Sequence, residues 1–435
     1  MVKKIIKKVI PKSIISHYHK FLALFASFIY GNPSNKLIVV GVTGTNGKST
    51  TISLISHILE EAGYKVGSTS TAEFKIGSKN WLNDKKMTML GRFKLQKLLY
   101  KMCKEKCEYA IIETSSEGIK QFRHLGINYD FVVFTNLTPE HIESHGSFEN
   151  YKNCKLELFK HLTKYKNKII NGKEIKKNIS VNRDDKNSGY FLSFDADKKV
   201  GFSINKESEY QAKNVELKPQ TKFRIQNQEF KTNLIGQFNI YNCLCAISVC
   251  NTLGVSINIC AKAIENYKGV PGRMEFINCG QDFKVIVDYA PEIESMRNLY
   301  SILDYFYYEK LIHVLGSCGG GRDRDRQPIL GKMSGGKADF VIITNEDPYE
   351  DDPMKIINNV AGGAIESGKE LDKNLFKILD RRLAIRKAIE LAGKDDLVLI
   401  TGKGSEQFIC VKNGKKIPWD DRRVAQEELK AKFNN

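Results

Sequence analysis

The sequence predicts an α/β protein with a larger domain on a mostly parallel sheet, followed by a smaller, Rossmann-like α/β domain. Short apolar runs alternate with helix-like segments along nearly the whole chain, as expected of buried parallel strands covered by helices. Several runs end in polar residues, where open α/β sheets bind their ligands. The alternation restarts after "GVPGRME", residues 269–275. With 435 residues, the chain is long enough for two or three domains.

The predicted elements follow in order. The strand "KLIVVGV" precedes a helix from Lys48 to about Gly63, and "YAIIETS" and "FVVFTN" are the next buried strands. Residues 172–230 are rich in Lys and Asn, weakly patterned and compatible with two short strand pairs, and a helix follows over residues 238–253. The later strands, separated by helices, are "FKVIVDY", "LIHVLG", "DFVIIT" and "DLVLITGKG".

The glycines and proline of "GVPGRME" indicate a domain boundary. We therefore divide the chain into a basic N-terminal segment (1–36), a first domain (37–271) and a second domain (272–435).

The N-terminal segment carries lysines at positions 3, 4, 7, 8 and 12 among apolar residues, and no Asp or Glu precedes Glu60. Its apolar run "FLALFASFIY" is too short to span a bilayer, and no small-x-small cleavage site follows it. Two interpretations stay open: a basic amphipathic helix lying on the inner membrane surface, and a helix packed on the first domain with a solvated lysine face.

The formal net charge of +18 favours anionic partners such as nucleotides, nucleic acid or a membrane surface. The ten cysteines include no Cys-x-x-Cys pair, and no second pair follows Cys103 and Cys107 to complete a zinc site. We expect reduced, buried thiols in a cytosolic protein.

The stretch "GVTGTNGKST", Gly41 to Thr50, is typical of a phosphate-binding loop. A helix N-terminus after a glycine-rich turn binds phosphate through backbone N–H groups and the helix dipole. Lys48 can reach the β- and γ-phosphates of ATP, and Ser49 or Thr50 can hold Mg²⁺. Five residues separate Gly41 from Gly47, instead of the usual four, so the loop is a variant.

This variant loop resembles that of the Mur ligase family. Further motifs in the family's order extend the resemblance to the C-terminus: "ETSSEG", "TNLTPEHIESHGSFENYKNCKLELF", "GQFNIYN", "GVPGRMEF", "VDYAPE", "GGGRDRDRQP", "NEDPYEDDP" and "TGKGSEQ". They are most similar to UDP-N-acetylmuramoyl-tripeptide synthetases. The resemblance implies a cytoplasmic, ATP-dependent, ADP-forming ligase of peptidoglycan synthesis. It would activate a carboxylate of a muramyl-peptide-like acceptor as an acyl phosphate and add an amino acid; no nucleic acid partner is implied.

The resemblance also implies site residues, carried over where the motifs match. The expected catalytic residues are Lys48, Glu113, His141 and Lys155. Two Mg²⁺ ions would be held by Ser49, Thr50, Glu113, His141 and Lys155. ATP would be bound by Gly44, Thr45, Asn46, Gly47, Lys48, Ser49, Thr50, Asn239, Asn242, Arg273 and Asp288. The acceptor would meet Ser115 and Ser116, and the amino acid would meet Arg322, Asp347, Pro348, Tyr349, Gly402 and Glu406. Asn239 and Asn242 fit equally well as helix-cap or turn residues.

Lys155 falls on an apolar helical stripe with Phe148, Tyr151, Phe159 and Leu162. An unpaired ammonium buried there would be costly, and a neutral amine can add CO₂. Periodicity alone equally allows a lysine that snorkels to solvent. In the family the matching lysine is carbamylated, so the resemblance implies a carbamate on Lys155.

The sequence also departs from the family's pattern. Close relatives carry a further domain before the loop that binds UDP, whereas forty residues precede Gly41 here. We therefore expect the acceptor to be a UDP-muramoyl dipeptide held by other means, or another carboxylate such as a lipid-linked precursor. Glu117 and Pro291 stand where the family has histidine.

The loop "NEDPYEDDP" bears on the choice of amino acid. Tyr349 stands where enzymes that add diaminopimelate carry an arginine that meets the distal carboxylate. A cluster of acidic side chains in this loop favours an amino acid substrate with a distal ammonium. The acids are Glu346, Asp347, Glu350, Asp351 and Asp352. We therefore expect lysine or ornithine in preference to diaminopimelate, although Asp351 and Asp352 equally fit as caps of a helix near Pro353.

Two other functions remain open. A folylpolyglutamate synthase has the same two domains and no UDP-binding domain, but usually shows "GKGS" where this chain has "GKST". A catalytically silent, nucleotide-binding partner protein would not need Lys48, Glu113, His141 and Lys155 together.

Overall fold

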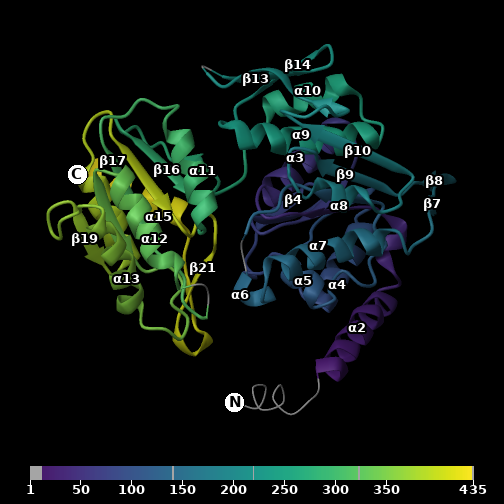
Figure 1. The fold of residues 1–435 in the computed structure, drawn as a ribbon, viewed down its shortest axis with the longest axis horizontal. Helices are drawn as coiled ribbons and strands as arrows, with labels where there is room; N and C mark the ends of the chain where they lie inside the picture. The colour runs from purple at the N-terminus through teal and green to yellow at the C-terminus, as the bar shows by residue number, and fades with distance from the viewer. Residues whose placement is uncertain (1–11, 140–141, 219, 322–323, 434–435) are drawn as a thin grey trace. The chain divides into compact units, whose positions relative to one another are not determined.

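The structure is a computed structural model that describes residues 12–139, 142–218, 220–321 and 324–433, and it divides into two units (Figure 1). The first unit holds the described residues up to Trp81 together with Met87–Lys268. The second holds Leu82–Lys86 and the described residues from Gly269 onward. The second unit is therefore made of two separate stretches of the sequence.

The first unit is built on a sheet that, within the described residues, has nine strands in the order β11-β10-β9-β6-β1-β5-β2-β3-β4. From β11 to β2 neighbouring strands are parallel, and β3 runs antiparallel to β2. The strands are β1 (Ile38–Thr43), β2 (Val66–Thr69), β3 (Glu73–Ile76), β4 (Lys79–Leu82), β5 (Tyr109–Glu113), β6 (Phe131–Phe134), β9 (Asn178–Asn182), β10 (Lys198–Ser203) and β11 (Tyr210–Gln211).

Helices cover both faces of this sheet (Figure 1). One face packs against α3 (Lys48–Glu61) and α9 (Gln237–Thr252), and α10 (Ile257–Asn266) packs against both of these helices. The opposite face packs against α4 (Arg92–Lys104), α5 (Ser116–Lys120), α7 (Phe148–Leu162) and α8 (Ser188–Leu192). The central strands are apolar at nearly every position because both of their faces are buried, which confirms the predicted mostly parallel sheet.

The region from residue 172 to residue 230 contains short antiparallel pairings, as expected, and also two strands of the main sheet. β9 and β10 extend that sheet in parallel. Beside them lie two smaller sheets: β7 (Lys168–Ile170) with β8 (Lys173–Ile175), and β12 (Lys213–Glu216) with β13 (Thr221–Ile225) and β14 (Gln228–Thr232). β9 is buried at every position although its sequence, "NISVN", begins and ends with asparagine, so its apolar pattern was too short to recognise.

The second unit has, within the described residues, a six-stranded sheet in the order β15-β16-β20-β17-β18-β19, parallel except for β15. The strands are β15 (Glu275–Phe276), β16 (Lys284–Asp288), β17 (Leu311–Leu315), β18 (Phe340–Thr344), β19 (Leu375–Ile378) and β20 (Leu397–Thr401). One face packs against α11 (Ile293–Leu303), α12 (Arg326–Lys337) and α13 (Pro353–Glu366). The other packs against α14 (Arg381–Leu391) and α15 (Asp421–Phe433), and β21 (Phe408–Cys410) pairs with β22 (Lys416–Pro418). The expected Rossmann-like architecture is confirmed.

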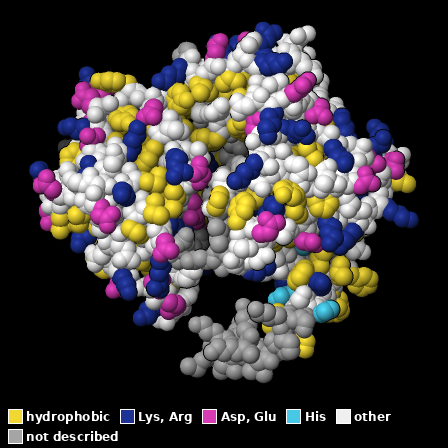
Figure 2. All heavy atoms as spheres, viewed as in Figure 1, with side chains coloured by type: hydrophobic (Ala, Val, Ile, Leu, Met, Phe, Trp, Pro, Cys, Tyr) yellow, Lys and Arg dark blue, Asp and Glu magenta, His cyan; other side chains and the backbone are white. Residues whose placement is uncertain are grey.

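The N-terminal helix α2 (Lys12–Ile29) packs against α4 in the first unit through small side chains, and Ala23 and Ala26 are buried. The packing of this helix on the first domain is what one interpretation expected, but the lysines at positions 3, 4, 7 and 8 lie outside the described residues, and the side chain of Lys12 is not described. The exposed side of α2 is largely apolar, and Figure 2 shows part of it. The exposed large side chains are Ile14, Tyr18, Phe21, Leu24, Phe25, Phe28 and Ile29. No helix in the described ranges combines the length and apolarity needed to cross a bilayer.

A buried charge cluster joins the ends of several segments in the first unit. Asp130, just before β6, accepts hydrogen bonds from Lys168 Nζ (2.5 Å), Lys177 Nζ (3.1 Å) and the backbone N–H of Val39 (2.8 Å). The side chains of Asp130, Lys168 and Lys177 are 0, 3 and 6 % exposed. One carboxylate therefore ties together the starts of β1 and β6, strand β7 and the segment before β9.

Candidate active site

The glycine-rich loop connects β1 to α3, as predicted, and a second loop holds it in place. The backbone N–H groups of Thr45 and Asn46 each donate to Asn136, to its carbonyl and its side-chain oxygen respectively, at 2.9 Å. Thr135 Oγ1 donates to the carbonyl of Asn46 at 2.8 Å. The loop after β6 therefore fixes the backbone at Thr45 and Asn46, just before the start of α3, where free N–H groups would face a phosphate.

Two of the loop glycines are required by their surroundings. Gly44 and Gly47 have φ of 149° and 82°, a range that glycine tolerates best. A Cβ on Gly44 would lie 1.9 Å from Thr135 Oγ1, and a Cβ on Gly47 would lie 2.2 Å from Asn242 Oδ1. The loop therefore contacts both the segment that follows β6 and helix α9.

Lys48, Ser49 and Glu113 lie together at the start of α3 and the end of β5. The Nζ of Lys48 donates to the carbonyl of Thr45 (2.7 Å) and lies 4.0 Å from Glu113 Oε1. Ser49 Oγ donates to Glu113 Oε2 at 2.8 Å. Thr50, the next predicted ligand, is partly buried on the same turn. The structure thus gathers Lys48, Ser49 and Glu113 as the sequence predicted.

Thr71 is a polar neighbour of Glu113 that the sequence reasoning missed, and Thr88 in turn contacts Thr71. The backbone N–H and the hydroxyl of Thr71 contact the carboxylate at 2.7 and 3.1 Å, and Thr71 Oγ1 lies 3.1 Å from Thr88 Oγ1. Glu113 is 1 % exposed, so these contacts fix its orientation. The signal for Thr71 in the sequence was the polar run "STST", residues 68–71, which begins within β2 and ends just beyond it.

Lys155 is buried beside the phosphate loop. It lies on the predicted apolar stripe of α7, where Tyr151, Phe159 and Leu162 are also buried. Its Nζ donates to the carbonyl of Gly44 at 2.8 Å and lies 4.5 Å from the centre of the Tyr151 ring. Because Lys155 is 1 % exposed, the alternative of a snorkelling lysine is wrong.

Near the start of α5, Ser115 and Ser116 take different roles. Ser115 caps the helix by accepting from the N–H of Gly118 at 3.2 Å, whereas Ser116 Oγ lies 3.2 Å from His145 Nε2. Burial, with a smaller effect from the charge of Lys120, lowers the pKa of His145. His145 was not predicted as a site residue, and the predicted His141 lies outside the described residues.

Asn239 and Asn242 are buried inside α9, so neither is a helix cap. Asn242 Nδ2 donates to Asn239 Oδ1 (3.0 Å), and Asn239 Nδ2 donates to the carbonyl of Ile235 (2.8 Å). This chain of hydrogen bonds holds the Asn242 side chain against Gly47.

In the second unit, Arg273 and Asp288 lie on the segments around β15 and β16. The guanidinium of Arg273 stacks 4.2 Å from the centre of the Tyr289 ring. Asp288 accepts from the N–H groups of Met274 (2.7 Å) and Ala290 (2.8 Å). Burial raises the pKa of Asp288, although the charge of Arg273 acts in the opposite direction.

Asp347 and Glu406, both predicted, come together in the second unit with two lysines. Lys403 Nζ lies 3.0 Å from each oxygen of Asp347 and 2.7 Å from Glu406 Oε2. Lys86 Nζ contacts Asp347 and lies 3.0 Å from Glu406 Oε2. Burial alone would raise the pKa of Asp347, but Lys403, Lys86 and the N–H of Cys410 lower it. Neither lysine was singled out from the sequence.

The other acids of "NEDPYEDDP" have local partners. Glu346 accepts from the Cys318 thiol (2.8 Å), and Glu350 accepts from the N–H of Asn413 (2.9 Å). Asp351 accepts from Gly320 and Arg324, and Asp352 caps α13 through the N–H of Met354. Of the five acids, Asp347 and Asp351 therefore have cationic partners, and the other three accept hydrogen bonds from neutral donors.

The remaining predicted residues of this loop shape its backbone. Tyr349 has a φ of 52°, in the left-handed region, and its ring packs over Gly320. Pro348 is buried, and Gly402 approaches Glu346 so closely that a Cβ would lie 2.4 Å from Glu346 Oε2. Arg322 lies outside the described residues.

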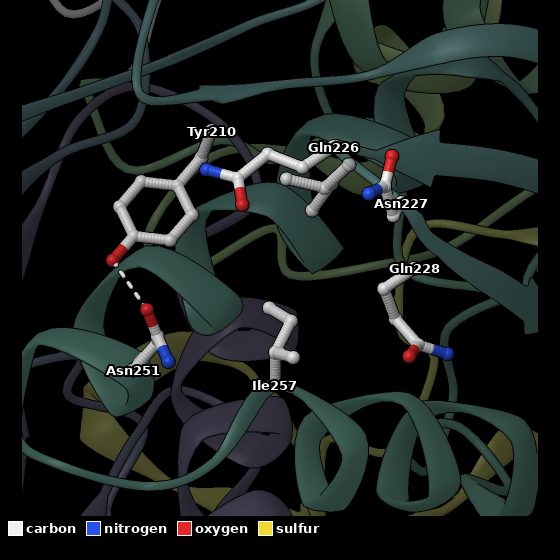
Figure 3. Close-up of a pocket in the computed structure, with 7 residues that line it drawn as sticks. Tyr210, Gln226, Asn227, Gln228, Asn251 and Ile257 are labelled. Carbon is white, nitrogen blue, oxygen red and sulfur yellow. Dashed lines mark hydrogen bonds between the residues drawn. The ribbon is translucent and has the colours of Figure 1, made fainter.

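A surface pocket of about 350 Å³ lies elsewhere on the first unit, between the turn of β13–β14, α9 and the start of α10 (Figure 3). Tyr210 donates to Asn251 Oδ1 at 2.9 Å on one side of it. Its lining is otherwise amide and aliphatic side chains and includes none of the predicted site residues, so we assign it no part in the chemistry.

The donor set around the phosphate loop fits Mg²⁺, which prefers oxygen ligands. The carboxylate of Glu113 and the hydroxyl of Ser49 are already adjacent. Among the described residues, no group of three or more His, Cys, Asp or Glu side chains could hold an ion. Protein ligands beyond these two would have to include groups of other kinds or residues outside the described ranges.

All ten cysteines are free; seven are buried, as expected, whereas Cys103, Cys154 and Cys279 are partly exposed. Burial raises the pKa of Cys243 and Cys260 to about 12, so these thiols resist ionisation.

Comparisons with known proteins cover most of the chain. The Mur ligase middle domain matches residues 42–250, and the domain described as "Mur ligase, glutamate ligase domain" matches residues 272–404. The chain is 35 % identical to the UDP-N-acetylmuramoyl-L-alanyl-D-glutamate–2,6-diaminopimelate ligase of Clostridium botulinum, covering 96 % of this chain and 83 % of that protein. It is 35 % identical to the UDP-N-acetylmuramyl-tripeptide synthetase of Roseiflexus sp., covering 97 and 84 %.

Among solved structures, Mycobacterium tuberculosis folylpolyglutamate synthase complexed with ADP and AMPPCP superposes with a TM-score of 0.71. The match covers 96 % of this chain and 95 % of that one at 13 % identity, which shows a shared fold alone.

Proposed function

Because this chain belongs to the Mur ligase family, and is therefore an ATP-dependent ligase that forms ADP, we propose that it joins a diamino acid to a carboxylate of a muramyl-peptide-like acceptor. The ligation would take place in the cytoplasm, as a step of cell-wall synthesis. The observation that carries this proposal is the gathering of Lys48, Glu113 and Lys155 around one phosphate loop.

The chemistry needs two steps. A carboxylate oxygen of the acceptor attacks the γ-phosphorus of ATP, and the bond from that phosphorus to the ADP oxygen breaks. The amine of the amino acid then attacks the acyl carbon, loses a proton and releases phosphate. Both steps bring charged groups together, so positioning and charge neutralisation supply most of the catalysis. Lys48 and the N-terminus of α3 supply positive charge where the triphosphate would lie.

Mg²⁺ would add charge neutralisation to this site. We propose that Ser49 or Thr50, Glu113, His141 and a carbamate on Lys155 serve two such ions. The carbamate forms when the neutral Nζ bonds to the carbon of CO₂ and loses a proton. Two features support it: Lys155 is buried, and its Nζ is held at the carbonyl of Gly44, beside the phosphate loop. The carbamate would replace a buried cation by an anion that offers oxygen ligands.

The acceptor and amino acid are proposed from the relatives and from motif matches. Ser116, next to His145, would meet the acceptor. The diaminopimelate ligase and the tripeptide synthetase among the relatives support a muramoyl-dipeptide acceptor and a diamino acid. Arg322, Asp347, Pro348, Tyr349, Gly402 and Glu406 would contact that amino acid.

We also propose that α2 touches the membrane surface peripherally. Seven large apolar side chains of this helix are exposed. The sequence around them is basic, with Lys3, Lys4, Lys7 and Lys8 before the helix and no acid before Glu60. Exposed aromatics next to lysines suit an anionic membrane surface.

Phosphate release from ATP tests the function directly. The assay would combine the protein with Mg²⁺, a panel of acceptors (UDP-muramoyl dipeptide, a lipid-linked equivalent, a folate) and a panel of amino acids. We expect release that depends on a muramyl dipeptide and a diamino acid, and a loss of about 100-fold or more in Lys48→Ala. Release that depends on folate and glutamate would favour a folylpolyglutamate synthase. No ligation with any pair would favour a silent nucleotide-binding protein.

A further inference from the structure

Four charged side chains form a compact cluster in the second unit, at the place where the amino acid's side chain is proposed to bind. They are the carboxylates of Asp347 and Glu406 and the ammonium groups of Lys403 and Lys86. Lys86 reaches the cluster from Leu82–Lys86, the short stretch that belongs to this unit although Trp81 and Met87 belong to the other.

The two lysines are held differently. An ammonium has three N–H donors. Lys403 lies within 3.0 Å of three carboxylate oxygen atoms and its side chain is 0 % exposed, so its donors are committed to the cluster. Lys86 contacts two carboxylates and its side chain keeps 7 % of its surface exposed. Lys86 is therefore the more accessible of the two cations.

The formal charges of the cluster cancel. A site with two unpaired acids would attract a bare ammonium, such as the side chain of lysine or ornithine. Here both acids already have ammonium partners. The bare ammonium of a substrate could therefore pair with these acids only by displacing Lys86. An amino acid whose distal carbon carries both an ammonium and a carboxylate presents two opposite charges. Its ammonium can share Glu406, the more exposed acid at 17 %, while its carboxylate meets Lys86.

We propose that Lys86 binds the distal carboxylate of the amino acid substrate and so selects a diaminopimelate-type amino acid over lysine. This inference rests on the proposed function, because it takes the Asp347–Glu406 cluster as the side-chain site. It assigns a specificity role to a residue that lies outside all of the motifs recognised in the sequence. It also reverses the expectation of lysine, because Asp347 already has two ammonium partners.

The test measures selectivity in three full-length variants. Lys86→Met removes the cation at similar length, and Lys86→Arg keeps it. Lys85→Met is the matched control, because Lys85 is the adjacent residue and its side chain pairs with Asp84 at the surface. Steady-state phosphate release would be followed with meso-diaminopimelate and with L-lysine, at saturating ATP and acceptor. Calorimetric titration of each amino acid gives a second readout that does not need turnover.

We expect Lys86→Met to raise the KM and Kd for meso-diaminopimelate about tenfold or more, the loss expected of one charge-assisted contact. The values for lysine should stay level or fall, Lys86→Arg should retain the preference, and Lys85→Met should behave as the unmodified protein. An equal change for both amino acids would indicate a structural role and overturn the proposal. Tighter binding of both would instead mean that Lys86 competes with the substrate, which also overturns it.

Failure of the proposed function would look different. In that case the unmodified protein would ligate neither amino acid to any acceptor and would bind neither. If the unmodified protein is an active ligase and Lys86→Met keeps its preference, only the role of Lys86 is refuted.

Discussion

Lys155 is buried, donates to the carbonyl of Gly44 and lies over the Tyr151 ring. If it carries a carbamate, Lys155→Ala should lose most ligase activity, because the site loses an anion. A short carboxylic acid such as acetate or formate should restore part of that activity by occupying the same space. Mass spectrometry after rapid trapping of the carbamate gives an independent check.

Lys152 is a matched control for this experiment, since it lies on the same helix, is similarly buried and pairs with Glu149 at 2.9 Å. Lys152→Ala should show no rescue by carboxylic acids. Rescue of both variants, or of neither, would count against a carbamate on Lys155.

Single residues also show what a sequence can and cannot reveal about a site. Lys48, Ser49 and Glu113 were predictable because two of them follow the loop motif and the third ends a clear strand. Thr71 and Lys86 were not, because their roles depend on folding that brings together residues far apart in the sequence: Thr71 lies 42 positions from Glu113, and Lys86 lies 261 from Asp347. Neither belongs to a pattern with a local chemical meaning.

At the level of elements, α2 presents an apolar face whose partner can be tested. Phe21→Asp combined with Phe28→Asp should weaken binding to vesicles about tenfold or more, because each buried phenylalanine contributes about 1.5–3 kcal/mol. Binding should need anionic lipid and weaken at high salt. Co-sedimentation with phosphatidylglycerol-containing and pure phosphatidylcholine vesicles measures this.

Tyr307→Asp is a suitable control, since Tyr307 is 70 % exposed on the second unit. The membrane proposal fails if the unmodified protein does not bind anionic vesicles. If it instead self-associates through α2 in sedimentation velocity, a second copy of the chain covers this face.

The Asp130 cluster joins several strands, so its loss should affect the whole sheet of the first unit. Asp130→Asn leaves the buried ammonium groups of Lys168 and Lys177 without a countercharge, which costs about 3–5 kcal/mol. Chemical unfolding monitored by circular dichroism would report the change in the free energy of unfolding. Glu157→Gln, in an exposed pair with Lys160, should change it by less than about 0.5 kcal/mol. A similarly small effect of Asp130→Asn would refute the structural role.

Elements were predicted well where both faces are buried and poorly where strands are short. Continuous apolar runs predict a buried strand with little ambiguity. Such runs form β1, β5, β6 and the strands of the second unit. β9 and β10 were missed because they are stabilised by neighbours in the sheet more than by their own composition.

The molecule as a whole should be sensitive to acid. His124 and His161 stack edge to face at 5.0 Å inside the first unit, and burial lowers the pKa of His124 to about 3 and that of His161 to about 4. Both pKa values lie below that of an exposed histidine. Between pH 6.5 and about 4 the unfolded chain therefore binds more protons than the folded protein does. The stability that these residues contribute is complete above pH 6.5 and is lost as the pH falls, by roughly 3 kcal/mol for His161.

Urea unfolding at a series of pH values would measure this loss. His161→Gln should flatten the dependence between pH 6.5 and 4, whereas His17→Gln, at an exposed position of α2, should leave it unchanged. An unaltered slope in His161→Gln would show that other groups cause the acid sensitivity.

The origin of Lys86 limits how modular this enzyme can be. Residues 82–86 belong to the second unit but are encoded within the first, so a fragment covering residues 269–435 lacks one of the four charges in the cluster. A chimera that joins the C-terminal half of this protein to the N-terminal half of a relative would receive Asp347, Glu406 and Lys403 from one parent, and the residue at position 86 from the other. The amino-acid preference of such a chimera would not be set by its C-terminal half alone. To transfer the preference from one parent to the other, residues 82–86 should have to be exchanged together with the C-terminal half.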